Sequence, residues 1–465
     1  MSTPIAPSFP SPSEVKASHP PALYMLFGTE MWERFSFYTM SAMLALYLQD
    51  KTDGFGWTKS QASTMLANYL MFVYASPLIG GWLADRILGY RRSISIGGLF
   101  FVAGHTLLAV QRPWALYLAL TFLVIGNGFF KPNISSMVGN LYPVGSRLRD
   151  SAYNIFYMGI NLGALAAPLV AEGVRQRYGF HPAFVVAGVG MAIGMIIFWA
   201  CYGRLAAADR EVGLSTPPNS DTTDLPDIPA PRSAIDDVPE WTRIGSLFVI
   251  FAIVIVFWMV FHQNATTLTY WANDNTDWAS SKFFPFLIRT ITFGHVDGEK
   301  VSGVISNSIN PFWIVVLAYP LTRVWAWLGR RGLEPSTPTK MALGMTFTGF
   351  AFLILFVAGR LGGDTGRVSP WWLVSAYAVL SLGELMLSPM GLSLVSKVAP
   401  ARLRAQLMGC WFLATAIGNK LTQISVFWER WSHSSFWLTL SLLAFAMAVL
   451  LFLLLRPLNR AMPGV

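Results

Sequence analysis

The chain contains, at residues 30–38, the stretch Glu30-Met31-Trp32-Glu33-Arg34-Phe35-Ser36-Phe37-Tyr38, in which two carboxylates and a guanidinium interrupt an apolar segment. Residues 23–48 around it otherwise have the composition of a membrane-spanning helix. Positions 30, 33, 34, 37 and 38 follow helical i, i+3, i+4, i+7, i+8 spacing, so a helix presents all five side chains on one face. Each charge at mid-bilayer depth costs about 2.5–3.5 kcal/mol, so this face has to meet a wet cavity or partner charges.

Two interpretations of this charged face remain open. It either holds helices together as a fixed charge cluster, or it forms a protonatable site on a transport path. Ionisable groups inside a membrane commonly mark ion and proton pathways, which favours the second interpretation.

The composition is that of a polytopic membrane protein. Of 465 residues, 54% are hydrophobic and only 12% are charged, whereas a soluble protein carries about 25% charged residues. Residues 183–202 and 436–455 contain no charge at all, and each is long enough to cross a hydrocarbon core of about 30 Å.

Apolar runs predict an all-α membrane protein with twelve spanning helices, arranged as two six-helix bundles around a central cavity. The expected helices are residues 22–49, 58–86, 92–111, 114–141, 150–173, 182–203, 243–270, 302–328, 340–359, 371–397, 403–424 and 434–456.

The two halves resemble each other in sequence. Residues 82–92 and 321–331 lie at the ends of the second and the eighth expected helix, and both contain a glycine near their end and finish in paired arginines. Between the halves, residues 204–242 are rich in Pro, Ser, Thr and Asp and cannot bury enough surface to fold alone. We therefore expect a tail at 1–21, bundles at 22–203 and 243–456, a cytoplasmic linker at 204–242 and a second tail at 457–465.

The net charge of +9 lies mainly in short loops between apolar runs, which argues against nucleic acid as a partner. Arg and Lys are more frequent in the loops on the side of the two termini, for example at Arg86, Arg91 and Arg92. The positive-inside bias then predicts an integral protein of the cytoplasmic (inner) membrane with both termini in the cytoplasm.

Enzyme chemistry has no support in the sequence. Cys201 and Cys410 lie in or at the end of expected helices, with no spacing that suggests a disulfide framework or a metal site. The expected helices contain no Ser/His/Asp order, metal-binding His pair or nucleophile motif. We expect neither enzymatic activity nor a cofactor.

Several motifs together make the chain similar to the proton-dependent oligopeptide transporter (POT/PTR) family of the major facilitator superfamily. The loop at residues 81–92 is typical of the superfamily as a whole, while the other motifs are more specific. They are Glu30-x-x-Glu33-Arg34-Phe35, Gly126-x-Gly128-x-x-Lys131-Pro132, Phe156-Tyr157-x-x-Ile160-Asn161-x-Gly163, Glu384-Leu385-x-x-Ser388-Pro389-x-Gly391 and Met408-Gly409-x-Trp411-Phe412.

The resemblance implies symport of protons with di- and tripeptides by alternating access, driven by the proton gradient. It implies that Glu30, Glu33 and Arg34 take part in proton coupling. It also implies that Lys131 and Glu384 pair with each other and bind the peptide termini, with roles in coupling as well.

The positions of Lys131 and Glu384 in corresponding helices of the two halves suit a short zwitterion. The peptide ammonium would meet Glu384, and its carboxylate would meet Lys131 and Arg34. A fixed ion pair that never touches a ligand is the alternative. Because a buried pair costs several kcal/mol per ion in desolvation, an exchangeable pair is the better use of these residues.

One departure from the family pattern concerns Phe257-Trp258-Met259-Val260-Phe261-His262-Gln263, where His262 replaces an acidic residue that would pair with Arg34. A histidine can change charge in the physiological range, which makes His262 a candidate for proton coupling, but its cation would repel Arg34. Either Glu30 or Glu33 replaces the missing carboxylate at the gate, or His262 is a neutral hydrogen-bonding residue.

The resemblance also implies six further substrate-binding positions. Asparagines at lipid depth often bridge helices instead, and the tryptophans alternatively serve as packing residues. The six positions are Tyr38, Tyr74, Asn161, Trp258, Asn310 and Trp411.

Three rival functions remain to be weighed against peptide symport. A transporter of another small solute, such as nitrate, would gain nothing from a buried Glu384. An intramembrane enzyme lacks motifs, and a sensor or scaffold would not need Lys131 and Glu384 for flux. The expected partners are di- and tripeptides, protons and membrane lipids, and the expected state is a monomer.

Overall fold

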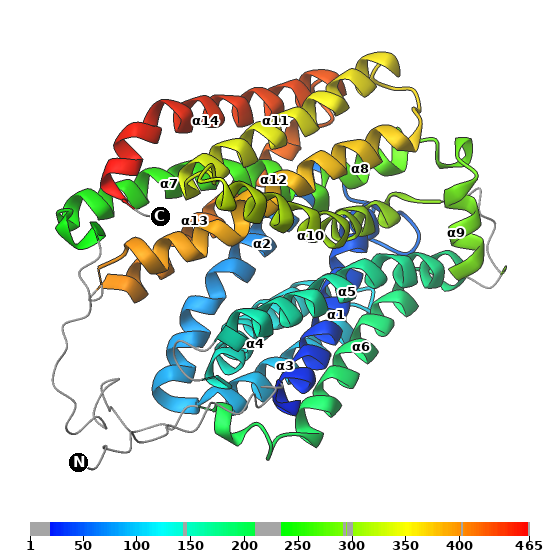
Figure 1. The fold of residues 1–465 in the computed structure, drawn as a ribbon. Coiled ribbons are helices and arrows are strands. Elements are labelled where there is room, and N and C mark those ends of the chain that lie inside the picture. Colours follow the sequence, from blue (N-terminus) through cyan, green and yellow to red (C-terminus); the bar gives the residue numbers. More distant parts are fainter. Residues whose placement is uncertain are drawn as a thin grey trace, which may run out of the picture.

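The computed structural model describes residues 19–142, 147–209, 234–291, 294, 301–400 and 403–463. Most of the expected first tail, most of the expected linker and residues 464–465 of the second tail lie outside these residues. The elements assigned within them are all helices, joined by short connections (Figure 1).

The first half of the chain forms six long helices that pack on one another. Helix α1 lies against α5 and α6, α3 lies against α4 and α6, and α2 lies against α4. Their bounds are α1 Pro21–Gln49, α2 Lys59–Leu83, α3 Tyr90–Leu107, α4 Pro113–Asn140, α5 Arg147–Tyr178 and α6 Phe180–Ala200.

The second half also contributes six long helices. Helix α11 lies against α12 and α14, α10 lies against α12, and α13 lies against α7. The two halves meet where α2 touches α13 and where α5 touches α10. The bounds are α7 Glu240–Phe261, α10 Ile309–Arg330, α11 Thr337–Leu361, α12 Pro370–Val398, α13 Arg404–Leu421 and α14 His433–Ala461.

Local sequence signals explain where several helices begin. Thr58 and Gln61 form a capping box at the start of α2, in which each side chain satisfies a backbone N–H of the other residue. Helices α1, α4, α11 and α12 carry a proline in their first turn, where no hydrogen-bonded N–H is needed.

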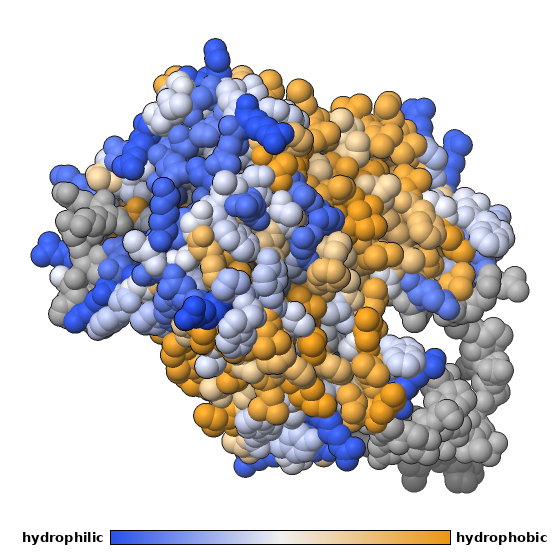
Figure 2. Space-filling view, turned by 180° about the vertical axis from the view of Figure 1, so that it is seen from behind, coloured by the Kyte–Doolittle hydropathy of each residue, from blue (hydrophilic) through white to orange (hydrophobic). Residues whose placement is uncertain are grey.

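The surface and the helix lengths fit a lipid environment. Within the described residues, nine helices are long and apolar enough to cross a membrane. Helix α1 is not among them, in keeping with Glu30, Glu33 and Arg34 in its middle. Figure 2 shows hydrophobic residues over wide areas of this face, at its upper right and across its lower part, and hydrophilic residues gathered mainly at its upper left and along its margins.

The long helices appear where the sequence predicts them, but several expected spans change their winding. Helix α2 continues as a π-helical turn, Ala84–Leu88, whereas residues 58–86 were expected to be one helix. Short 3-10 segments precede α10 (η7, Gly303–Ser308) and follow α13 (η9, Thr422–Phe427).

The structure differs from the prediction at residues 243–270, where the expected single helix is interrupted. Helix α7 ends at Phe261, residues His262–Ala265 form a 3-10 turn, and a separate helix α8 covers Thr267–Asp274. At the break, the Gln263 side chain donates to the Met259 carbonyl and, in the segment that follows α13, to the Thr422 carbonyl.

The connection between α8 and η7 holds a further helix, α9 (Phe283–Ile291), between the expected helices at 243–270 and 302–328, where none was predicted. Phe284 and Ile288, four residues apart, are both buried on one side of α9. This i, i+4 spacing is the signal from which the helix could have been predicted, although nine residues are too few to span a membrane.

The contact between α2 and α4 depends on glycine. A Cβ on Gly80 would lie 2.0 Å from the Gly128 carbonyl oxygen, whereas a Cβ on the neighbouring Gly81 would meet the Pro132 side chain at an ordinary 3.6 Å. Backbone atoms cannot move aside as a flexible side chain can.

We predict that Gly80→Ala lowers the thermal unfolding midpoint of the detergent-purified protein, since overpacking of a close contact costs about 1–3 kcal/mol. Gly81→Ala is the matched control and should unfold within experimental error of the parent protein. Equal midpoints for the two variants would contradict the close approach of α2 and α4.

Candidate functional site

A cavity of about 330 Å³ lies between the two halves of the chain. Helices α1, α2, α4 and α5 form one wall, and α7, α10, α12 and α13 contribute the other. All but one of the sequence-predicted site residues line it: Glu30, Arg34, Tyr38, Tyr74, Lys131, Asn161, Trp258, His262, Asn310, Glu384 and Trp411.

The exception, Glu33, lies behind the wall and is 1% exposed. Its carboxylate accepts a hydrogen bond from Nε of Arg34, and the same nitrogen lies 3.2 Å from Oε1 of Glu30. The three residues therefore form one buried charged group on α1, with Glu30 and Arg34 toward the cavity.

This charged group retains free hydrogen-bonding capacity. Within the described part of the chain, Oε2 of Glu30, Oε1 of Glu33 and Nη2 of Arg34 have no hydrogen-bond partner. A buried donor or acceptor without a partner is costly, so the group is prepared to accept a ligand atom or a proton.

Close helix packing buries these charges. A Cβ on Gly163 of α5 would lie 2.3 Å from the Met31 carbonyl oxygen of α1. The glycine of the α5 motif thus brings the backbone of α5 against the charged turn of α1.

Lys131 occupies a different part of the same wall. Its Nζ atom lies 4.7 Å from the centroid of the Tyr74 ring, in a cation–π contact between α4 and α2. No carboxylate of a described residue forms an ion pair with it.

Glu384 lies on the opposite wall, on α12. Nδ2 of Asn310 donates to Oε2 of Glu384 at 2.9 Å and to Oγ of Ser381 at 2.9 Å. Asn310 therefore both bridges α10 to α12 and faces the cavity, so the two alternatives for this asparagine are not exclusive.

The ion pair between Lys131 and Glu384, which the family resemblance implied, is absent from this structure. Each charge has its own neutral partner instead, the Tyr74 ring for Lys131 and the Asn310 amide for Glu384. The cavity separates a cation on one wall from an anion on the other.

Aromatic rings connect the two halves beside these charges. The ring of His262 stacks on that of Trp258, with centroids 4.8 Å apart and an interplanar angle of 16°. Tyr74 of the first half lies 5.6 Å from His262. Nδ1 of His262 has no hydrogen-bond partner among the described residues, while the Asn419 side chain lies within hydrogen-bonding reach of the ring.

Trp411 closes another part of the second wall. A Cβ on Gly391 would lie 1.8 Å from the Trp411 ring, so glycine is needed for this indole to lie against α12. The ring also meets Phe251 of α7 edge to face, at 6.1 Å.

Asn161 hydrogen-bonds within its own helix, with Nδ2 2.9 Å from the Tyr157 carbonyl oxygen, and it bridges to no other helix through that bond. Sequence reasoning missed Tyr157 itself, which also lines the cavity. The signal was present, because Tyr157 precedes Asn161 by four residues in the same motif and shares its helix face. Asn307, Phe261 and Phe412 are further lining residues that were not predicted.

Metal binding has no visible basis in the described ranges, where no three His, Cys, Asp or Glu side chains are grouped to hold an ion. The arrangement is instead suited to a solute with a positive and a negative end, held between Glu384 and the cations Lys131 and Arg34. The aromatic walls would accept apolar groups without reading their identity.

Comparison with known proteins agrees with this geometry. Residues 33–422 match the family model described as Major Facilitator Superfamily. The chain is 33% identical to the di-/tripeptide transporter of Lactococcus lactis subsp. cremoris, over 96% of this chain and 97% of the relative. It is 31% identical to the peptide transporter YePEPT of Yersinia enterocolitica, over 86% of each chain.

Solved structures are similar over nearly the whole chain. A peptide transporter POT in complex with alafosfalin has 32% identity and a TM-score of 0.82, with 96% of each chain covered. A POT family transporter in complex with 5-aminolevulinic acid has 26% identity and a TM-score of 0.82, with 95% of this chain and 97% of that chain covered.

Proposed function

The chain belongs to the POT family of peptide transporters within the major facilitator superfamily, and we propose that it imports di- and tripeptides together with protons by alternating access. It is an integral membrane transporter and not an enzyme. We further propose that residues 22–203 and 243–456 are the two bundles that move, in an inner membrane, with both termini in the cytoplasm.

One observation carries the proposal. Lys131 and Glu384 line the same cavity from opposite halves of the chain without pairing with each other. A peptide has an ammonium at one end and a carboxylate at the other. Glu384, held by Asn310, would receive the ammonium, while Lys131 and Arg34 would receive the carboxylate.

Such a peptide would join the two halves by charge. Tyr38, Tyr74 and Asn161 would surround it on the first wall, and Trp258, Asn310 and Trp411 on the second. Nitrate or another anion is a poorer candidate, because a buried carboxylate such as Glu384 would repel it.

Proton coupling follows from the group on α1. Arg34 contacts both Glu30 and Glu33 and compensates part of their charge. When a substrate carboxylate engages Arg34 and Lys131, one of the two glutamates loses part of this compensation and becomes free to bind a proton. The cycle then needs no cofactor beyond the proton gradient, and we propose that a monomer suffices.

His262 fits a neutral role better than a titrating one. A cationic ring at this position would face the Lys131 ammonium across Tyr74, and like charges repel. Glu30 and Glu33 already pair with Arg34, so the family's acidic residue on α7 is replaced in function by the α1 carboxylates.

The direct test is uptake of labelled dialanine into proteoliposomes, with and without an inward acid gradient. We expect accumulation that requires the gradient. In the same assay Glu384→Gln should lower the uptake by about 30-fold or more, because removal of one partner of a buried charge pair costs 2–5 kcal/mol. Glu429→Gln, a change at an exposed position outside the cavity, is the control and should leave uptake unchanged.

Uptake that ignores the gradient would contradict proton coupling. Undiminished uptake by Glu384→Gln would remove that carboxylate from the substrate site.

Glu33→Gln is expected to separate coupling from substrate exchange. The variant should lose most gradient-driven accumulation, because its amide cannot exchange a proton, and should retain exchange of labelled for unlabelled peptide across the vesicle membrane. A parallel fall of both activities would show that Glu33 is structural and not a coupling residue.

The role of His262 is tested with two substitutions, one that keeps an aromatic ring and one that keeps a hydrogen-bonding group. His262→Phe retains a ring for stacking on Trp258 and should keep the parent's pH profile of uptake, whereas His262→Gln retains hydrogen bonding and should be slower. If the histidine instead carries the proton, both variants will lose the parent's pH dependence to the same extent.

A further inference from the structure

Hydrogen bonds that join the two halves gather at one end of the molecule, where α2 begins and α5 ends. Nζ of Lys59 lies 2.6 Å from Oδ2 of Asp274, and the hydroxyls of Ser63 and Tyr270 are 3.2 Å apart. Further along α5, Oγ of Ser308 donates to the Leu165 carbonyl at 2.9 Å. The transporter is therefore closed at this end.

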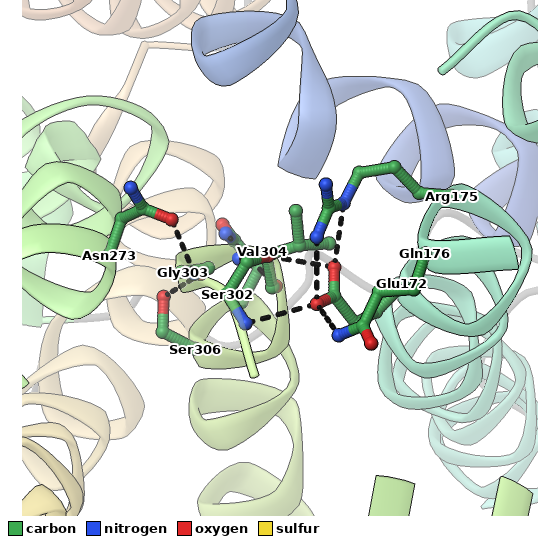
Figure 3. A network of polar contacts seen from close by, with 9 residues as sticks. Glu172, Arg175, Gln176, Asn273, Ser302, Gly303, Val304 and Ser306 are labelled. Atoms are coloured by element: carbon green, nitrogen blue, oxygen red, sulfur yellow. Dashed lines mark hydrogen bonds and ion pairs between the residues drawn. The ribbon is translucent and has the colours of Figure 1, made fainter. Parts of the chain in front are cut away.

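Another buried contact of this closure is made by Glu172, near the end of α5. Its side chain is 0% exposed, and Figure 3 shows it facing the segment that leads into α10. From that segment, the backbone N–H of Ser302 donates to Oε1 at 3.0 Å and the Ser302 hydroxyl donates to Oε2 at 2.7 Å.

The carboxylate has a second set of donors on its own helix. Nε and Nη2 of Arg175 donate to Oε2 and Oε1 at 3.0 and 3.1 Å, and Nε2 of Gln176 donates to Oε1 at 2.5 Å. These donors would move together with Glu172. If Ser302 withdrew, Arg175 would still compensate the buried charge, which would otherwise cost several kcal/mol.

Ser302 is connected to the substrate cavity. Its hydroxyl also accepts from the Val304 N–H and thus caps η7, the 3-10 segment that leads directly into α10. Asn307 and Asn310 follow on the same continuous stretch and line the cavity. Gly303 is fixed too, because its N–H donates to Oδ1 of Asn273 at 3.2 Å (Figure 3).

We propose that Glu172 and Ser302 form a reversible latch, which holds α5 against η7 when the cavity is closed at this end and releases when it opens there. Glu172 acts as a gating residue and touches no substrate. Arg175 and Gln176 donate from its own helix, and Ser302 donates from the opposite half. Glu172 can therefore lose Ser302 while Arg175 still compensates its charge. The latch rests on the proposed alternating access, and it adds a residue that sets the balance between the two states.

The test measures the distance between the halves at the latched end, independently of transport. Spin labels are attached to cysteines in Lys51→Cys and Ala279→Cys, both exposed, in a Cys201→Ser, Cys410→Ser background. Pulsed electron paramagnetic resonance of the protein in nanodiscs then gives the populations of short and long distances between the two spin labels. Glu172→Ala should raise the ratio of long to short by about tenfold or more, since a hydrogen bond to a charged group contributes 1.5–3 kcal/mol.

Ser302→Ala removes the hydroxyl bond to Glu172 and keeps the backbone N–H bond. It should therefore produce a smaller shift toward long distances. Combined with Glu172→Ala, it should add nothing further, because the two residues act on one contact. Arg177→Ala, an exposed change on the same helix outside the network, is the control and should leave the distances unchanged.

An unchanged distance distribution in both Glu172→Ala and Ser302→Ala would overturn the latch, even if either variant unfolds at a lower temperature. The outcome is separable from that of the proposed function. Shifted distances without peptide uptake by the parent protein would retain the latch and reject peptide transport, whereas normal uptake with unshifted distances would do the reverse.

Discussion

Charges inside the membrane-spanning core need partners, and this requirement organises the whole cavity. Arg34 meets it locally, between Glu30 and Glu33 on the same helix. Lys131 and Glu384 meet it only in part, through a ring and an amide. The first group is therefore compensated in part without a substrate, while the other two residues, whose partners are neutral, gain most from a substrate that carries both signs.

The same constraint explains how the helices are placed. Gly163 lets α5 approach the charged turn of α1, and Gly391 admits the Trp411 ring against α12. The cavity lies between the halves, whereas the contacts between Glu172 and Ser302 and between Lys59 and Asp274 lie at one end. Alternating access requires a substrate site in the middle of the protein and contacts between the halves that close the cavity at one end.

Much of this arrangement was predictable from sequence because it depends on local patterns. Helix spacing placed Glu30 and Arg34 on one face, and the family resemblance assigned Lys131, Asn310 and Glu384 to one substrate site. The break after Phe261 was missed because a few polar residues carry little periodic signal. Helix α9 was missed although Phe284 and Ile288 have helical spacing, because nine residues are too few to be recognised as a span. Lys131 and Glu384 do not pair in this structure, because partners across a cavity depend on how far apart the two halves stand, which no local pattern encodes. That the two residues exchange partners during transport stays a prediction.

The central claim is that opposed charges on the two walls recognise both ends of a short peptide. It is tested most directly by calorimetric titration of the purified protein with dialanine, its N-acetyl derivative and its C-terminal amide. We expect each cap to weaken binding by about 30-fold or more, because each removes one partner of a buried charge contact. Equal affinity for the capped and the free peptides would contradict the account.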